Sequence, residues 1–95
     1  MIRHVVLWRL KPGNGDAFPA LREALEAQRG RIPGLVRVEV GRNVSPSRRA
    51  VDMALLCDFE SREALAAYHR HPAHLETRAI VDPLAAEHWI VDYEI

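Results

Sequence analysis

The sequence predicts an α+β domain in which four strands form an antiparallel sheet and helices cover one face of it. Three segments alternate apolar and other side chains with the period of two that marks strands. Amphipathic helical segments follow the first and the third of them. A chain of 95 residues has room for one hydrophobic core, so we expect residues 1–95 to form a single domain.

The first strand is expected over Ile2–Leu10, with His4 on its more apolar face. The turn-forming run KPGNG follows. Asp16 is then expected to cap a helix that ends before Gly30. The apolar positions of this helix fall on one stripe made of Phe18, Leu21, Ala24 and Leu25.

The remaining strands are expected over Leu35–Val44, Val51–Phe59 and His88–Ile95, with the polar run NVSPSRR as a hairpin loop between the first two. Ser61 is a suitable N-cap for the second helix, and Pro72 interrupts that helix before a shorter helical stretch, 73–79. The resulting order, β-α-β-β-α-β, is the ferredoxin-like arrangement.

One face of this sheet has no helix to cover it. We expect it to pack against the same face of a second copy, giving a homodimer, because it is too apolar for water and its charges balance. The alternative is a half-exposed antiparallel sheet. The side chains assigned to this face are Arg3, Val5, Leu7, Arg9, Leu35, Arg37, Glu39, Asp52, Ala54, Leu56 and Asp58.

The charge is balanced overall, with 13 basic and 13 acidic residues, which argues against a nucleic-acid binder. Residues 1–50 carry a net charge of +6 and residues 51–95 a net charge of −6, so we expect oppositely charged strands to lie side by side. In that arrangement Arg3 and Arg9 neighbour Asp52 and Asp58. The single cysteine, Cys57, and the absence of a long apolar run predict a cytoplasmic protein that does not enter a membrane.

Most of the candidate catalytic side chains are histidines. His4 lies on the apolar face of the first strand, and His71 and His74 follow Tyr68 at the end of the second helix. A phenol beside buried imidazoles supplies a general acid and base without a cofactor. His69 is expected to face solvent. Two other interpretations remain open, namely core or helix-terminal histidines and a metal site in the run HRHPAH, whose spacing Pro72 disrupts.

The sequence resembles the stress-responsive dimeric α/β-barrel (Dabb) family. The resemblance rests on the opening IRHVVLWRLK, on IPGL at 32–35, on GRN at 41–43, on Tyr68 with the run HPAH at 71–74, and on the closing VDY. It implies a dimeric α+β barrel. In one characterised kind of member, a plant polyketide cyclase, the matching residues imply catalytic roles for His4, Tyr68 and His74 and an orienting role for Asp92.

That resemblance implies a pocket for a small hydrophobic or aromatic ligand, with no metal and no cofactor. The side chains expected to contact the ligand are Val6, Trp8, Leu25, Leu55, Cys57, Leu65 and His71. Two positions depart from the cyclase, which has a tyrosine at the position of Leu25 and an aliphatic residue at that of His69. Periodicity leaves open whether Asp92 or the apolar set Trp89, Val91 and Tyr93 faces the helices.

Three other functions stay open beside acid/base catalysis of the cyclase or aldol type. They are a non-catalytic ligand-binding stress protein, a haem- or metal-binding protein, and a monooxygenase-like dimeric barrel. The haem and the monooxygenase are alternatives by analogy of fold alone.

Overall fold

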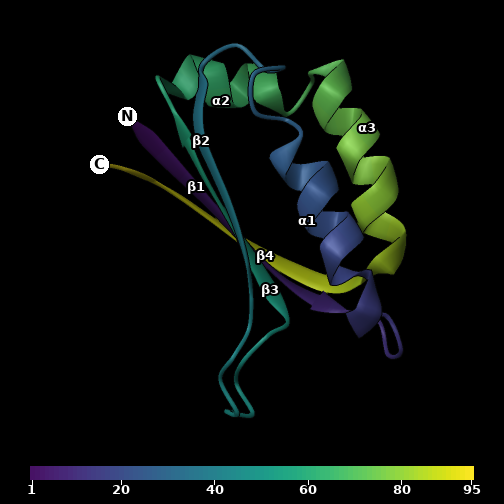
Figure 1. Cartoon of the computed structure of the whole chain (residues 1–95). Helices are drawn as coiled ribbons and strands as arrows, with labels where there is room; N and C mark the ends of the chain where they lie inside the picture. The colour runs from purple at the N-terminus through teal and green to yellow at the C-terminus, as the bar shows by residue number, and fades with distance from the viewer.

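A computed structural model describes residues 1–95 and confirms the expected ferredoxin-like α+β fold. Four strands form one antiparallel sheet in the order β2-β3-β1-β4, and the helices lie on one face of it (Figure 1). The strands are β1 (Ile2–Leu10), β2 (Leu35–Arg42), β3 (Met53–Phe59) and β4 (Ala85–Glu94). The helices are α1 (Phe18–Glu26), α2 (Arg62–Tyr68) and α3 (Pro72–Val81), with short 3-10 turns at Gly15–Ala17 and Asp82–Leu84.

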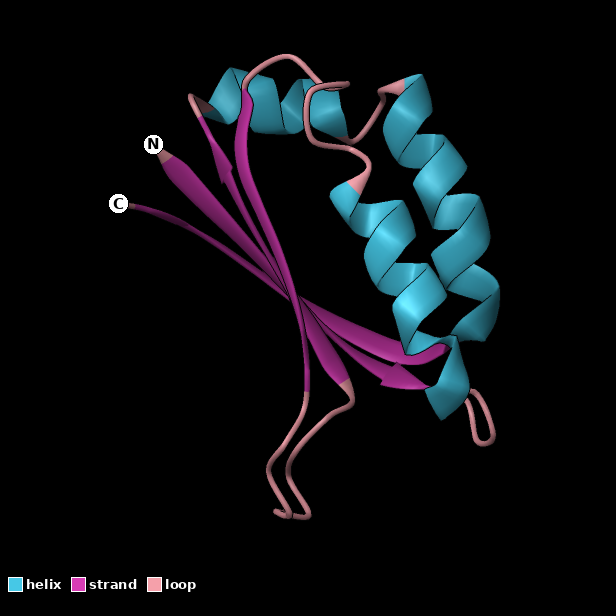
Figure 2. Ribbon diagram, in the orientation of Figure 1, coloured by secondary structure: helices cyan, strands magenta, loops and turns pink.

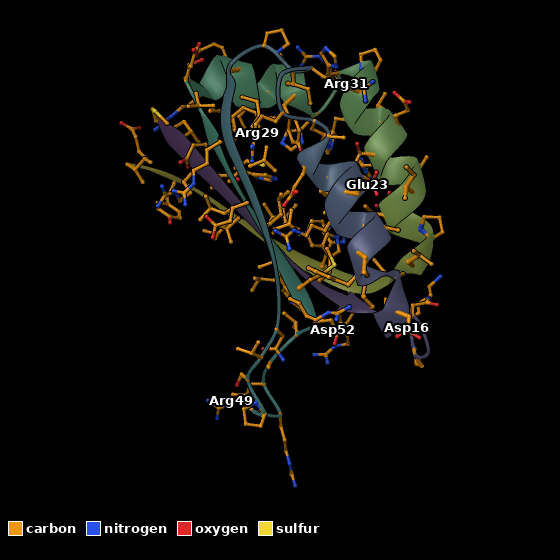
Figure 3. The ribbon with its side chains drawn as sticks, viewed as in Figure 1. Asp16, Glu23, Arg29, Arg31, Arg49 and Asp52 are labelled. Carbon is orange, nitrogen blue, oxygen red and sulfur yellow. The ribbon has the colours of Figure 1, made fainter.

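β1 lies in the middle of the sheet, between β3 and β4. It pairs His4 with Cys57 on one side and with Asp92 on the other, so the register brings the two ends of the sequence together. The N- and C-termini lie side by side at one end of the sheet, while the β2–β3 hairpin projects beyond the other end (Figure 2). Arg49 lies in that projecting hairpin (Figure 3).

Four strand boundaries differ from those expected, one of them by a single residue, since β4 ends at Glu94 rather than Ile95. β2 ends at Arg42 rather than Val44 and β3 begins at Met53 rather than Val51, so the hairpin loop is longer. Side chains in the loop bond the local backbone, as where Asn43 Oδ1 accepts from the Ser45 amide at 2.9 Å, and such bonds compete with strand pairing. β4 begins at Ala85 rather than His88 because pairing with β1 continues to Leu10 past an irregularity.

The start of α1 and both ends of α3 also differ. Asp16 does not cap α1: it lies in the preceding 3-10 turn, and the N-cap residue Ala17 offers no side-chain acceptor. The cap at Ser61 is confirmed, since its hydroxyl accepts from the Ala64 amide at 3.1 Å. Helix α3 begins at Pro72 and continues to Val81, two residues beyond the expected end.

A β-bulge at the start of β2 reverses one assignment. The register shifts between Leu35 and Arg37, so Leu35 packs against the core and Val36 is half exposed. A bulge inserts one unpaired residue and moves the side chains before it to the other face. Leu35 therefore does not belong to the uncovered face.

The core lies between the helices and the face of the sheet that contains Val6 and Leu55. Leu21 and Leu25 of α1 are almost completely buried against it. Gly34, in the turn before β2, has φ +81°, and a Cβ there would lie 2.5 Å from the Cβ of Ala64 in α2. Only glycine fits this contact between the turn and the helix.

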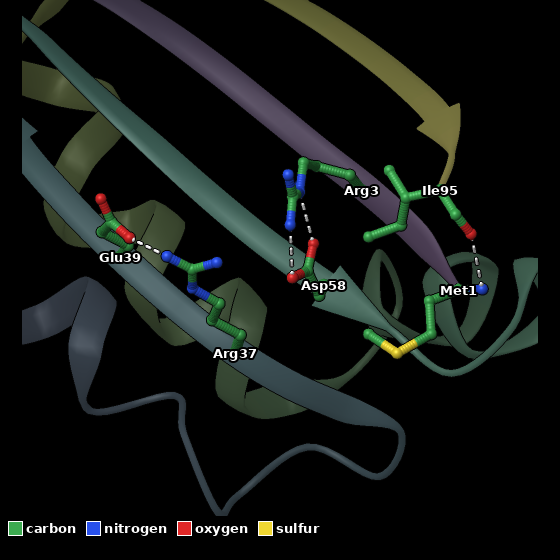
Figure 4. A network of polar contacts seen from close by, with 6 residues as sticks. All are labelled: Met1, Arg3, Arg37, Glu39, Asp58 and Ile95. Carbon is green, nitrogen blue, oxygen red and sulfur yellow. Dashed lines mark hydrogen bonds and ion pairs between the residues drawn. The ribbon is translucent and has the colours of Figure 1, made fainter.

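The uncovered face of the sheet is apolar and has ion pairs among its side chains. Trp89, Val91 and Tyr93 of β4 point to this face and are 43%, 55% and 44% exposed. Arg3 donates two hydrogen bonds to the Asp58 carboxylate, at 2.8 and 3.1 Å, beside the Arg37–Glu39 pair (Figure 4).

The sequence halves of opposite charge do meet in the sheet, though not in every expected pair. Arg9 pairs with Glu87 at 3.2 Å rather than with Asp52. The Asp52 carboxylate instead accepts from the backbone amide of Leu10 at 2.6 Å, where the β2–β3 hairpin meets the end of β1. The bidentate pair with Arg3 holds the pKa of Asp58 below its usual range. None of the helices has the length and apolar character needed to span a membrane.

Candidate functional site

A cavity of about 140 Å³ lies between the helix-covered face of the sheet and helices α2 and α3. Strands β1, β3 and β4 and helices α1, α2 and α3 all contribute lining residues, most of them from β1 and α3. Its lining residues are His4, Val6, Trp8, Leu25, Leu55, Tyr68, His69, His74, Thr77, Arg78, Val81, Asp82, His88 and Ile90.

His4 is held by the carboxylate of Asp92. The ring is 3% exposed, and its Nδ1 lies 2.5 Å from Asp92 Oδ1. A carboxylate accepts only, so Nδ1 carries the hydrogen and Nε2 is left to interact elsewhere. The carboxylate also balances the positive charge that His4 would carry after protonation. Asp92 therefore faces the helix side, and Trp89, Val91 and Tyr93 face the other, which answers the question that periodicity left open.

His74 is held by a neutral group. Its Nδ1 lies 3.1 Å from Oε1 of Gln28, a side chain that is completely buried. Burial is the main cause that lowers the pKa of His74, to about 4, and the nearby His69, Arg78 and His4 act in the same direction. At neutral pH His74 is therefore an uncharged imidazole.

Tyr68 lies between the two histidines. Its ring centroid is 4.0 Å from that of His74 and 5.9 Å from that of His4, and the residue is 1% exposed. Burial raises the pKa of the phenol, while the amide of Gln28 acts more weakly in the opposite direction. The phenol keeps its proton at neutral pH and can donate it in a hydrogen bond.

Both imidazoles present a free nitrogen to the cavity. No buried side-chain nitrogen or oxygen lacks a hydrogen-bond partner. The Nε2 atoms of His4 and His74 have none within the protein, since each histidine bonds through Nδ1. They must therefore be accessible from the cavity that both residues line.

His69 is exposed to solvent, as expected, and it also lines the cavity. Its ring centroid lies 5.7 Å from that of His4 and 5.9 Å from that of His74. Burial, followed by the neighbouring His4, lowers its pKa. It is the C-cap residue of α2, where the helix turns toward α3.

The structure brings together most of the expected site and leaves part of it out. The catalytic candidates His4, Tyr68 and His74 line the cavity. Asp92 does not line it but bonds Nδ1 of His4. Of the expected ligand contacts, the cavity is lined by Val6, Trp8, Leu25 and Leu55.

Three expected contacts do not line the cavity. Cys57 is completely buried beneath the helices, where burial raises its pKa to about 12, and Leu65 packs in the core. His71 instead caps α3, because its Nδ1 accepts from the Ala73 amide at 3.0 Å. The signal for this cap is in the sequence, where His71 stands directly before Pro72 at the first helical position.

The cavity is suited to proton transfer on a small molecule. A dry cavity of roughly 150 Å³ holds one benzene molecule, and this one is of that size, with Val6, Trp8 and Leu55 as apolar lining. No group of three or more His, Cys, Asp or Glu side chains is arranged to hold a metal ion. The titratable side chains that meet at the centre of the cavity are imidazoles and a phenol.

Comparisons with known proteins show the family and the fold. The sequence model of a family described as the stress responsive A/B barrel domain matches residues 2–95. An uncharacterised protein of Streptomyces coelicolor is 36% identical over 98 residues, covering 99% of each chain.

Solved structures resemble the fold over almost its whole length. A protein of Arabidopsis thaliana has a TM-score of 0.89 at 26% identity, covering 100% of this chain and 95% of its own. A dimeric ferredoxin-like protein of unknown function from Thermobifida fusca has a TM-score of 0.88 at 26% identity, covering 99% of this chain and 90% of its own.

Proposed function

The chain belongs to the stress responsive A/B barrel domain family, and we propose that it is a cofactor-free acid/base catalyst of the aldol or cyclase type. Its substrate would be a small hydrophobic or phenolic molecule with an enolisable carbonyl group. One observation carries this proposal: the free nitrogens of His4 and His74 open on the same cavity as the phenol of Tyr68. Groups of this kind at hydrogen-bond reach of one ligand are what enolisation requires.

In the proposed reaction, Nε2 of His74 takes a proton from the carbon beside a carbonyl. The electron pair of the broken C–H bond forms the enolate double bond, and the carbonyl π electrons move to oxygen. Tyr68 donates a hydrogen bond to that oxygen as its charge develops. The apolar lining strengthens these interactions by limiting water.

The enolate carbon then attacks a second carbonyl of the same molecule and forms the new C–C bond. The resulting alkoxide takes up one proton, which His4 is placed to supply from its Nε2 as an imidazolium balanced by Asp92. Solvent returns a proton to His4 and accepts the one held by His74, so the number of protons is unchanged.

Deuterium exchange into a simple ketone tests the first step. Cyclohexanone is a single ring, about the size that the cavity can hold. It exchanges its α-hydrogens slowly in neutral D₂O, so NMR can follow catalysed exchange directly. We expect saturable exchange by the wild type, a large loss in His74→Ala and a smaller loss in Tyr68→Phe. His71→Asn removes an imidazole outside the cavity and keeps a cap for α3, so it should match the wild type. Exchange no faster in the wild type than in His74→Ala would rule out this function.

A non-catalytic ligand-binding protein is the second candidate. The low pKa of His74, about 4, makes it a weak base, and this favours binding over catalysis. Saturable chemical-shift changes at Trp8 and Val6 on adding phenol, without any ketone exchange, would identify this function instead.

The uncovered sheet face supports a homodimer as part of the proposal. Structural neighbours are described as dimeric. Here Val5, Leu56 and Val91 lie in one row across β3, β1 and β4, and self-complementary apolar faces of this kind form two-fold interfaces. Sedimentation of the wild type at micromolar concentration should give a dimer, and a monomer would contradict it.

A cytoplasmic location is also proposed. Cys57 is unpaired and buried, as in proteins of reducing compartments. Cell fractionation with a cytoplasmic marker tests this, and recovery outside the cytoplasmic fraction would contradict it.

A further inference from the structure

Gln28 is an uncharged polar residue in a place where apolar side chains are the rule. It lies in the turn after α1, with its side chain completely buried between α1 and α3. Burying an amide costs free energy unless its hydrogen bonds are made. Both ends of this amide have partners, so its burial is compensated.

The two hydrogen bonds fix the orientation of the amide. Its Nε2 donates to the backbone carbonyl of Leu25 at 3.1 Å, so the atom that faces His74 is Oε1. A carbonyl oxygen only accepts, and Nδ1 of His74 must therefore carry the hydrogen. The Nε2 atom of His74 is then left with its lone pair facing the cavity. A free histidine in water favours the opposite tautomer, with hydrogen on Nε2.

The two histidines of the cavity are therefore held by different kinds of partner. The partner of His4 is a carboxylate, which accepts from Nδ1 of the ring. Gln28 gives His74 a neutral acceptor, which selects a tautomer and adds no charge. The other groups facing His74 are Tyr68, His69, Arg78, His4 and Asp82, of which only Asp82 favours protonation, and it is paired with Arg78.

We propose that Gln28 is a positioning residue that fixes His74 as the Nδ1–H tautomer, so that Nε2 accepts a proton or a hydrogen bond from the ligand. In the proposed reaction His74 is the acceptor, and His4, whose partner is the Asp92 carboxylate, is the donor. The role of Gln28 in catalysis rests on the proposed function, but the tautomer of His74 that Gln28 selects does not.

Long-range ¹H–¹⁵N NMR of the ring nitrogens reads the tautomer directly in the wild-type protein, without any substrate. We expect His74 to show a protonated Nδ1 and an unprotonated Nε2 at pH 7. A protonated Nε2 in the wild type would overturn the proposal, whatever the outcome of the ketone experiment.

Two substitutions test the cause. Gln28→Leu removes the acceptor at nearly constant volume and should move His74 toward the Nε2–H tautomer. Gln28→Glu keeps the acceptor and adds charge, so it should keep the Nδ1–H tautomer and raise the pKa of His74 by about one to three units. His71→Asn is the control, because it removes an imidazole that lies outside the cavity and keeps a cap for α3.

If the protein catalyses exchange, Gln28→Leu should lower kcat by about tenfold or more and leave KM nearly unchanged, as outer partners of functional histidines commonly do. Should Gln28→Leu fail to fold, Gln28→Glu and the wild-type spectrum still decide the matter. Two results together would assign Gln28 a structural role only. They are a His74 pKa that is unchanged in Gln28→Glu and, in the wild-type protein, a His74 ring with its hydrogen on Nε2.

Discussion

Acidification from pH 7 to pH 4 should destabilise the protein partly through His74, and replacing this residue with glutamine should remove that part of the loss. The folded state holds His74 neutral, because its ring is half-buried in the cavity wall and its partner is an uncharged amide. In the unfolded chain the same side chain titrates near its ordinary pKa. Between pH 6.5 and pH 4 the unfolded state therefore binds a proton that the folded state does not.

The magnitude follows from the two pKa values. The folded value of about 4 against the ordinary 6.5 is a difference of about 2.5, or about 3 kcal/mol at 1.36 kcal/mol per unit. Because the ring is partly exposed, we expect about 2 to 3 kcal/mol. Stability is fully retained above pH 6.5, falls as the pH is lowered through this window, and stays flat below pH 4 as far as His74 is concerned.

Urea unfolding at fixed protein concentration, measured at intervals from pH 4 to pH 8, gives the free energy of unfolding of the wild type and of His74→Gln. The free energy of unfolding of the wild type should fall by about 2 to 3 kcal/mol more than that of His74→Gln toward low pH, since contributions from groups distant from His74 cancel. If the free energies of unfolding of the two proteins change in parallel with pH, His74 is not held neutral in the folded state.

Three further outcomes follow from particular contacts. Gly34→Ala should lower the free energy of unfolding by about 2 kcal/mol or more, because its φ is positive and the new methyl group meets Ala64; thermal melting checks this, and an unchanged Tm would contradict it. Cys57 should react with a thiol reagent only as the protein unfolds, since it is fully buried and its pKa is about 12; fast labelling of the native protein would show that the core is open. Val91→Asp should shift the sedimentation of the protein from dimer to monomer, and a stable dimer would move the interface elsewhere.

The sequence predicts the elements well where one signal dominates. β1 occupies the expected range because alternation over Ile2–Leu10 is uninterrupted, and Ser61 caps α2 because its hydroxyl has a free amide to accept from. The helical stretch after Pro72 extends further than expected, since proline is well placed at the first position of a helix even where it ends the one before.

The face of the sheet to which a side chain points, and the residue it contacts on a neighbouring strand, are harder to predict. Both depend on pairing between segments that are distant in the sequence. Both faces of β4 contain large apolar side chains, and only its register with β1, which pairs His4 with Asp92, decides which face the helices cover. Likewise, one bulged residue moves Leu35 to the core side. Periodicity counts residues within a strand and has no information about the neighbouring strand.

The positions of two residues of the site cannot be predicted from the periodicity of the sequence. His69 follows Tyr68 directly, so a regular helix would separate their directions, yet both rings meet at the end of α2, where the chain turns. Gln28 lies in a turn after α1 and is typical of solvent-exposed positions by composition. Its role is visible only when α3 brings His74 to within hydrogen-bond distance.

The central claim is that Tyr68 and His74 act on one and the same ligand in the cavity. A double-mutant cycle on cyclohexanone exchange tests it most directly, with the wild type, Tyr68→Phe, His74→Ala and the double variant measured at one pH. Because the two side chains would serve a single proton transfer, the double variant should be no slower than His74→Ala alone. Rate losses that multiply in the double variant would contradict the account, since they would mean that the two groups act independently.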